Sequence, residues 1–230
     1  MALLIESYQR LPGRRPEEDS ASWAVRMQEG LEAFRRETAM RYTEGTLQRL
    51  LAEHHRVARR AAVLTLGMLG TLASNKPVAG RLHDRDSHVR QLAHDALWSI
   101  WFRADTDEHN QALQRLLRVR SPLKALAGLD GLIQKAPSFA EAYNQRAIVH
   151  FRMEEYQKSI GDCETVLKLN PHHFGAASGM AQCYMKLHKP KAALRSFRSA
   201  FRINPNLDGI EDTIRTLEDV LGEEGKKEDR

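Results

Sequence analysis

Histidine is the residue type with the most obvious capacity for chemistry here, because a neutral imidazole binds metal ions and exchanges protons near neutral pH. The chain has 10 histidines. Adjacent residues on a helix point about 100° apart, so two neighbouring histidines cannot easily share one metal ion. No His-x-x-x-His or Cys-x-x-Cys pattern occurs. We therefore expect surface or turn histidines, and no metal site, at His54-His55, His172-His173, His83, His88 and His94.

Patterns typical of catalysis are also missing from the sequence. No Gly-rich loop follows a predicted strand, no Gly-x-Ser-x-Gly occurs, and no carboxylate pair lies inside an apolar stretch. Asp84 and Asp86 precede an Ala-rich segment, where we expect them to cap a helix. The sequence thus predicts a protein that is not an enzyme and binds no cofactor or metal.

The charge and cysteine content set further limits. The net charge of +5 suggests a nucleic-acid partner, yet basic and acidic residues number 16 and 13 up to Asp105 and 19 and 17 beyond it. Neither half is strongly basic, so bulk charge supports nucleic-acid binding only weakly. Cys163 and Cys183 are too few for a disulfide framework, and we expect both to be buried. With no run of 18 apolar residues, we predict a cytoplasmic protein without membrane insertion.

Residues 140–173 contain the pattern that organises the chain. They end in a Leu-Asn-Pro that returns in the next copy as Ile-Asn-Pro, so Pro171 and Pro205 fix a period of 34 that also reaches back to Pro137. A period of this length with apolar helical patterns on both sides of a turn is typical of stacked helical hairpins. This stretch resembles a tetratricopeptide repeat (TPR).

The resemblance can be checked position by position when Ala140 is counted as position 1. The family has small residues at positions 8 and 20, where the two helices cross and a large side chain would hold their backbones apart. These positions are Ala147 and Ser159 in one copy, and Ala181 and Ala193 in the next. A degenerate copy precedes them, with Leu116, Ala125, Leu129 and Leu132 in family positions but Leu113 where a small residue is expected. We assign repeats to 106–139, 140–173 and 174–207.

The N-terminal half shows a weaker repeat, which we call the N-terminal repeat. Sliding 46–70 onto 77–101 pairs Arg59 with Arg90 and Ala62 with Ala93. The Asp-rich turn and the Val-Arg that follows it resemble a HEAT-type repeat, in which the Arg contacts neighbouring loops as the resemblance implies. Independently of the family, Asp86 or Ser87 is a good N-cap.

The remaining segments complete the predicted organisation. Residues 1–19 are expected to be a flexible arm, and 20–105 HEAT-like helices that open with an amphipathic capping helix. Residues 97–102 are apolar on all sides, which favours a buried seam between two repeat arrays over an aromatic binding patch. A capping helix that Gly222 ends closes the TPR region 106–222, and 223–230 form a charged tail. The predicted fold is an all-α solenoid of stacked hairpins, HEAT-like and then TPR.

The TPR resemblance also implies a binding groove. In that family the first helix of each hairpin lines a concave surface through positions 2, 5, 9, 12 and 13. Position 5 carries short amides or a hydroxyl, position 12 apolar side chains and position 13 basic ones, and asparagine amides can hold a peptide backbone. We predict an adaptor whose groove binds a partner protein or an extended, partly acidic peptide; alternatively, the basic row is only solvated. The predicted groove residues are Asn110, Leu117, Arg118, Asn144, Ile148, Phe151, Arg152, Ser178, Gln182, Met185 and Lys186.

Specific residues argue for or against two other kinds of partner. The family's clamp for chaperone C-termini requires Asn, Lys and Arg where this chain has Gln145, Gly175 and Gly179, so we do not expect that partner. The alternative to the adaptor is binding of nucleic acid or an anionic surface by a basic stripe on the last repeat, although a solvated face is the simpler interpretation. The stripe consists of Lys191, Arg195, Arg198 and Arg202.

Overall fold

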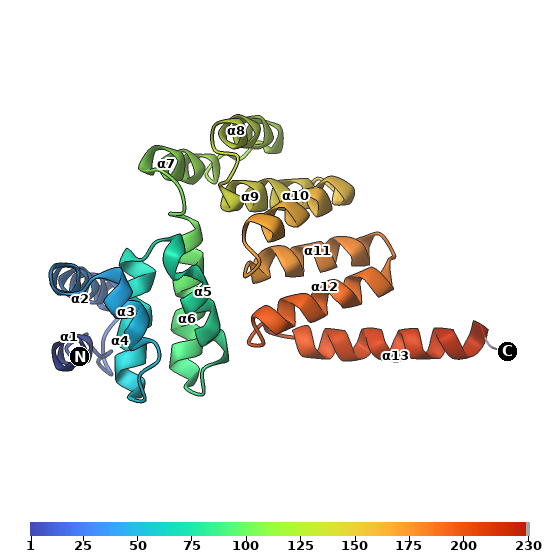
Figure 1. Cartoon of the computed structure of the whole chain (residues 1–230). Helices are drawn as coiled ribbons and strands as arrows, with labels where there is room; N and C mark the ends of the chain where they lie inside the picture. Colours follow the sequence, from blue (N-terminus) through green and yellow to red (C-terminus); the bar gives the residue numbers. More distant parts are fainter. Residues whose placement is uncertain (229–230) are drawn as a thin grey trace. The chain divides into compact units, whose positions relative to one another are not determined.

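The computed structural model describes residues 1–228, and the side chains of residues 1–222. Within that range every regular element is an α-helix or a short 3₁₀ turn (Figure 1). The chain divides into two compact units, Met1–Ile100 and Trp101–Arg230. The prediction of an all-α fold of stacked helices is confirmed.

The first unit is built from short helices around an alanine-rich and leucine-rich core. Its elements are α1 (Ala2–Gln9), α2 (Ser20–Arg41), α3 (Glu44–Leu50), α4 (Arg56–Leu69), the 3₁₀ turn η1 (Leu72–Ser74), α5 (Asn75–Ala79), the 3₁₀ turn η2 (Gly80–His83) and α6 (Ser87–Trp101).

The predicted flexible arm is wrong for residues 2–9, which form helix α1. Leu4 on this helix is fully buried, and α1 packs against both α2 and α4. Tyr8 makes an edge contact with Phe34 of α2, with ring centroids 6.3 Å apart. The short apolar run at the N-terminus therefore serves as packing surface, because burying it removes apolar area from water.

The N-terminal repeat appears in the core of this unit. Ala62 and Leu66 of α4 are completely buried, and so are their counterparts Ala93 and Leu97 of α6. Gly67 lets the two helices approach closely, because a Cβ added there would lie 2.9 Å from the Cβ of Ala96. Each helix thus presents its small and apolar face to the interior, as the sequence pattern predicts.

The second unit contains three helical hairpins and a closing helix. These are α7 (Asp107–Leu116) with α8 (Pro122–Lys135), α9 (Ala140–Arg152) with α10 (Tyr156–Leu169), α11 (Phe174–Lys186) with α12 (Pro190–Ile203), and α13 (Ile210–Glu228). The step from the start of α9 to the start of α11 equals the step from α10 to α12, and both equal the period seen in the sequence.

Small residues allow the helices of the second and third hairpins to cross closely. Ala147, Ser159, Ala181 and Ala193 are all buried, and the Ser159 hydroxyl donates to the carbonyl of Ala147 at 2.9 Å. This bond joins repeat positions 8 and 20 directly. The predicted crossing point of the hairpin is therefore confirmed at atomic level.

The closing helix extends further than predicted. α13 continues through Gly222 to Glu228, whereas we expected Gly222 to end it and a tail to begin at residue 223. Glycine weakens a helix interior by only about 1 kcal/mol, so a helix that is already anchored by buried Ile210 and Leu217 can continue past it. Residues 229–230 of the predicted tail lie outside the described residues.

Candidate functional site

The predicted groove lies on the first helices of the hairpins, and α9 and α11 contact one another directly. The apolar row is accessible: Leu117 and Met185 are exposed, and Phe151 is half-buried with its ring edge against Tyr156, at a centroid distance of 5.5 Å. Of the other groove residues, Ile148 and Ser178 are half-buried and Gln182 is exposed. All of these side chains are at least partly accessible to water.

The basic row is accessible as well. Arg118, Arg152 and Lys186 are all exposed, and no ion pair within residues 1–222 involves any of them. Each follows directly after a member of the apolar row in the sequence. An accessible apolar residue and an unneutralised cation thus follow one another in the sequence at the end of α9 and again at the end of α11.

The amide row predicted to hold a peptide backbone is not available to a ligand. Asn144 is only 3% exposed and donates to Glu141 Oε1 at 2.9 Å. Asn110 donates to the carbonyl of Asp105 at 2.8 Å and accepts from the same residue's N–H at 3.2 Å. That prediction was wrong because both amides satisfy local groups at the start of their own helices.

A buried polar cluster replaces the amide row at α9. Glu141 and His173 are both fully buried, and the distance from His173 Nε2 to Glu141 Oε2 is 3.0 Å. His173 Nδ1 accepts from the backbone N–H of Ala176 at 3.0 Å, which assigns the imidazole proton to Nε2 and makes His173 the donor to Glu141. Trp101 stacks on the imidazole, with ring centroids 4.0 Å apart and an angle of 20° between the planes.

The prediction of a surface or turn position for His173 was wrong, because the side chain is buried. The cluster has a structural role. His173 is the N-cap of α11, so its ring satisfies one of the free N–H groups that begin every helix. Glu141 also accepts from Gln145 at 2.6 Å, which leaves no acceptor facing water. A sequence signal existed in the apolar run 97–102, which contains Trp101, but nothing in that run indicated a polar partner further along the chain.

The other predicted histidines and the cysteines show no reactive arrangement. His54, His55, His83 and His88 are exposed as predicted, and His172 and His94 are half-buried. In the described part of the chain no three His, Cys, Asp or Glu side chains lie close enough together to hold a metal ion. Both cysteines are buried as expected, and burial raises the pKa of Cys163 to about 12, which keeps the thiol protonated.

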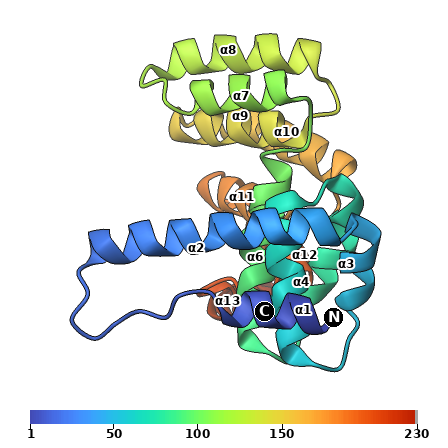
Figure 2. The ribbon, with the colours of Figure 1, turned by 90° about the vertical axis from the view of Figure 1, so that its left-hand side faces the viewer.

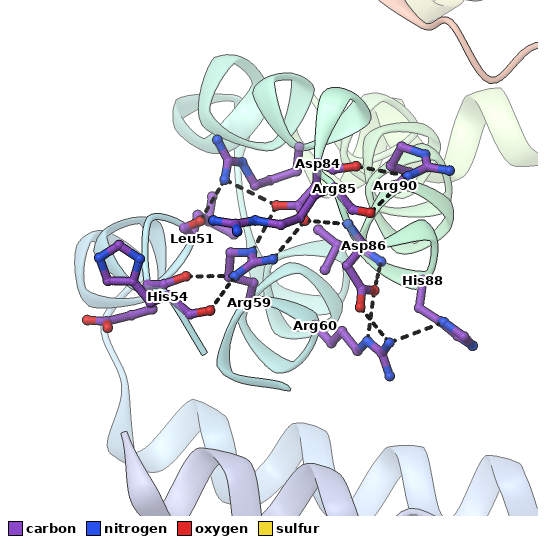
Figure 3. A network of polar contacts seen from close by, with 12 residues as sticks. Leu51, His54, Arg59, Arg60, Asp84, Arg85, Asp86, His88 and Arg90 are labelled. Atoms are coloured by element: carbon purple, nitrogen blue, oxygen red, sulfur yellow. Dashed lines mark hydrogen bonds and ion pairs between the residues drawn. The ribbon is translucent and has the colours of Figure 1, made fainter. Parts of the chain in front are cut away.

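The first unit contains a dense polar network at the Asp-rich turn (Figure 3). Arg59 donates to both carboxylate oxygens of Asp84 at 2.9 Å, and both side chains are nine-tenths or more buried. Arg59 also donates to the carbonyls of Glu53 and His54 at 2.8 and 2.9 Å. Arg90 bonds the carbonyls of Asp84 and Arg85 in the same relative positions, so the N-terminal repeat extends to these hydrogen bonds.

Of the two predicted caps, Asp86 and Ser87, it is Asp86 that caps the N-terminus of α6. Its Oδ1 accepts from the N–H of Val89 at 3.1 Å, and the Arg60 guanidinium donates to both of its oxygens at 2.9 and 2.6 Å. The bond from Arg60 is the main reason that the pKa of Asp86 falls from 3.8 to about 2. Burial works to raise the pKa of Asp84, but its bonds to Arg59 and to the N–H of Asp86 outweigh burial and the net shift is downward. The turn is therefore a charged structural junction.

The alternative basic stripe is exposed along α12 but is not purely basic. Lys191, Arg195, Arg198 and Arg202 all face solvent. Arg198 pairs with Glu218 of the adjacent α13 at 2.7 Å. The carboxylate comes from a helix that packs against the stripe, so the absence of acidic residues in the local sequence did not predict it.

Comparison with known proteins identifies one repeat of the second unit. The tetratricopeptide repeat family model matches residues 140–173. A TPR repeat-containing protein of Rhizobium etli is 35% identical over 97 residues, which make up 42% of this chain and 48% of that protein. Anaphase-promoting complex subunit 3 of Schizosaccharomyces pombe is 32% identical over 87 residues, or 38% of this chain and 13% of that subunit. The structure of a thermophilic TPR protein of Thermus thermophilus aligns over 85% of this chain and 92% of its own, with 18% identity and a TM-score of 0.38.

The share of each relative that this chain covers limits what the matches show about this protein. The chain spans about half of the first relative and a small part of the second. The matches identify a TPR repeat, and such repeats commonly mediate protein–protein interactions and are typically not catalytic. They do not test the HEAT-like prediction. No helix within residues 1–228 is both long and apolar enough to cross a membrane.

Proposed function

We propose that this TPR repeat protein is an adaptor that binds an extended, partly acidic peptide across the ends of α9 and α11, with α7 extending the surface. The observation that carries this proposal is the twofold pairing of an accessible apolar side chain with an unneutralised cation. Phe151 and Arg152 form one pair, and Met185 and Lys186 form the other.

The chemistry of the peptide follows from which groups are available. Because Asn110 and Asn144 are engaged internally, the peptide backbone is not held by an amide row, and side-chain anchors must supply the affinity. Methionine and phenylalanine adapt to apolar side chains of several shapes. Arg152 and Lys186 favour carboxylates and increase the association rate more than the affinity. The ligand is therefore a short motif with apolar and acidic residues close together.

The first unit, in this proposal, is a HEAT-like pair of repeats that supports the adaptor. The Asp-rich turn, the cap by Asp86 and the matching bonds of Arg59 and Arg90 support this assignment. The free, buried cysteines suit a reducing compartment, so we place the adaptor in the cytoplasm.

A peptide-display selection on the parent chain tests the function. Selected peptides should be enriched in apolar residues next to Asp or Glu, and Phe151→Ala with Arg152→Glu should reduce binding by at least about tenfold, or ~1.4 kcal/mol. Arg152 is exposed and Phe151 is only half-buried, so helicity by circular dichroism should be unchanged.

A matched control separates this face from the basic stripe. Arg195→Glu changes the same kind of charge on α12 and should leave peptide binding intact. Selection of peptides without acidic residues, or equal loss in the control, would contradict the proposal. Steeply salt-dependent binding of a generic RNA that Arg195→Glu weakens and the α9 variant does not would support the stripe instead.

A further inference from the structure

Helix α2 is long for the amount of core it covers. It runs for 22 residues, about 33 Å, yet only Phe34 and Thr38 are buried. Figure 2 shows its N-terminal half extending beyond α3 and α4 of the same unit. The residues before α2 return beneath this extension, where Pro12 lies close to Gly30 and Arg26 pairs with Glu18. One face of α2 is thus supported by its own chain while the opposite face is open.

The open face carries a stripe of five side chains that recur every three or four residues. Val25 and Met40 mark its two ends and are 58% and 81% exposed. Between them lie Glu29 and Glu32, followed by Arg36, all of them exposed. We call these five residues the α2 stripe. Its N-terminal half is acidic and its C-terminal half is basic, and an apolar residue closes each end.

Among residues 1–222, no residue outside α2 forms an ion pair with the charged residues of the α2 stripe. Among residues 1–222, Glu29 and Arg36 belong to no ion pair, and Glu32 pairs only with Arg35 on the same helix, at 3.2 Å. A solvent-open hollow on this face is lined by Val25, Gln28, Glu29, Glu32 and Arg36. The face therefore combines unmatched charges of both signs with a recess for a side chain.

We propose that the α2 stripe is a self-association surface, on which a second copy of this chain packs its own α2 antiparallel. A twofold interface uses the same patch on both copies, so the patch must be complementary to itself when reversed. The α2 stripe meets this condition. With Glu29 opposite Arg36 of the other copy, Val25 falls opposite Met40, because each apolar residue lies four positions outside its charged neighbour.

The distribution of charge is what favours a second copy over another partner. A surface for an acidic or a basic peptide needs charge of one sign, whereas this stripe carries two glutamates followed by an arginine. Antiparallel pairing places Glu29 of each copy opposite Arg36 of the other, and this pair occurs twice through the symmetry. Glu32 lies beside the twofold axis, where its ion pair with Arg35 offsets the like charge of Glu32 in the second copy. The apolar ends then exclude water from the outer turns, where the helix would otherwise leave Met40 exposed.

Sedimentation velocity over a concentration series tests the proposal on the full chain. The parent should form a dimer whose dissociation constant increases with salt, because solvent-exposed charge pairs are screened. Glu29→Arg and Arg36→Glu should each place like charges opposite one another and weaken the dimer by about tenfold or more. Lys191→Glu, a charge reversal on exposed α12, should leave it unchanged. Circular dichroism checks that each variant keeps its helix content.

Mixing the two variants gives the decisive result. Glu29→Arg in one copy faces Arg36→Glu in the other, so the mixture should form a heterodimer although each variant alone is weakened. The double variant should dimerise like the parent for the same reason. A parent that stays monomeric at every concentration would overturn the proposal and leave the face to another partner. Equal weakening by Lys191→Glu, or no recovery on mixing, would overturn the antiparallel arrangement.

Discussion

Truncating Trp101 gives the most direct test of the buried cluster of Trp101, Glu141 and His173 at the N-terminus of α11. The indole is 1% exposed, stacks on His173 and lies 5.1 Å from the ring of Phe174. A buried tryptophan removes roughly 150–250 Å² from water, worth about 4–6 kcal/mol at ~25 cal/mol/Å². Measured Trp→Ala changes in protein cores cost about 3–5 kcal/mol. We therefore expect Trp101→Ala to destabilise the second unit by about 3–5 kcal/mol.

Urea unfolding, monitored through the helix signal in circular dichroism, measures this loss of unfolding free energy. A loss of this size corresponds to a decrease in melting temperature of roughly 12–20 °C for a unit of this length. Trp98→Ala is the matched control, because Trp98 is only half-buried and its Nε1 donates to His94 at 3.2 Å. It should cost about 1–2 kcal/mol.

The comparison of the two tryptophans can also refute the reasoning. If Trp101→Ala costs less than about 1 kcal/mol, or no more than Trp98→Ala, the indole does not fill the interior around His173. A loss of partner capture without a loss of stability would instead favour the aromatic binding patch. The predicted role of these residues as a seam between two repeat arrays stays a prediction.

Three further outcomes follow from the structure. His188 has a φ of 54°, so His188→Gly should relieve backbone strain and stabilise by up to about 1 kcal/mol in urea unfolding, whereas Arg195→Gly within α12 should cost about 1 kcal/mol. Asp84→Ala leaves the buried Arg59 guanidinium without its carboxylate and should cost about 3–5 kcal/mol; a melting temperature equal to that of the parent would contradict the role of this pair. Because folding lowers the pKa of Asp86 from 3.8 to about 2, its contribution is complete above pH 3.8 and is lost as the pH falls towards 2; Asp86→Asn should reduce this loss, as measured by unfolding midpoints across that range.

The sequence predicted the hairpins of the second unit because their determinants are local and periodic. Small residues at the crossing points of the second and third hairpins and a proline at each repeat end recur with one period, and α9 to α12 start at the same interval. The left-handed residues repeat as well: Glu154 and His188 both have positive φ and occupy the same position in successive repeats. The cap by Asp86 was predictable for the same reason, since a cap bonds the helix that directly follows it.

The sequence did not predict which groove residues would be accessible. Family positions pointed to Asn144 as a ligand contact, but it is buried and bonded to Glu141. The identity of an asparagine does not reveal whether its amide faces water or a neighbouring carboxylate, because that depends on what covers it. Only the folded chain brings Glu141 and His173 together from separate hairpins and places Trp101 on the imidazole.

Helix α1 at the N-terminus also depends on tertiary packing that the sequence did not predict. The apolar run before residue 6 is too short to predict a stable helix, since isolated short helices are marginal in water. Packing of Leu4 and Tyr8 against α2 and α4 stabilises α1, and that surface exists only after the rest of the unit has folded. The repeats could thus be predicted from the sequence, because their signals lie within one hairpin. The tertiary structure decided burial and pairing, because the free energy of both depends on groups that are distant along the chain.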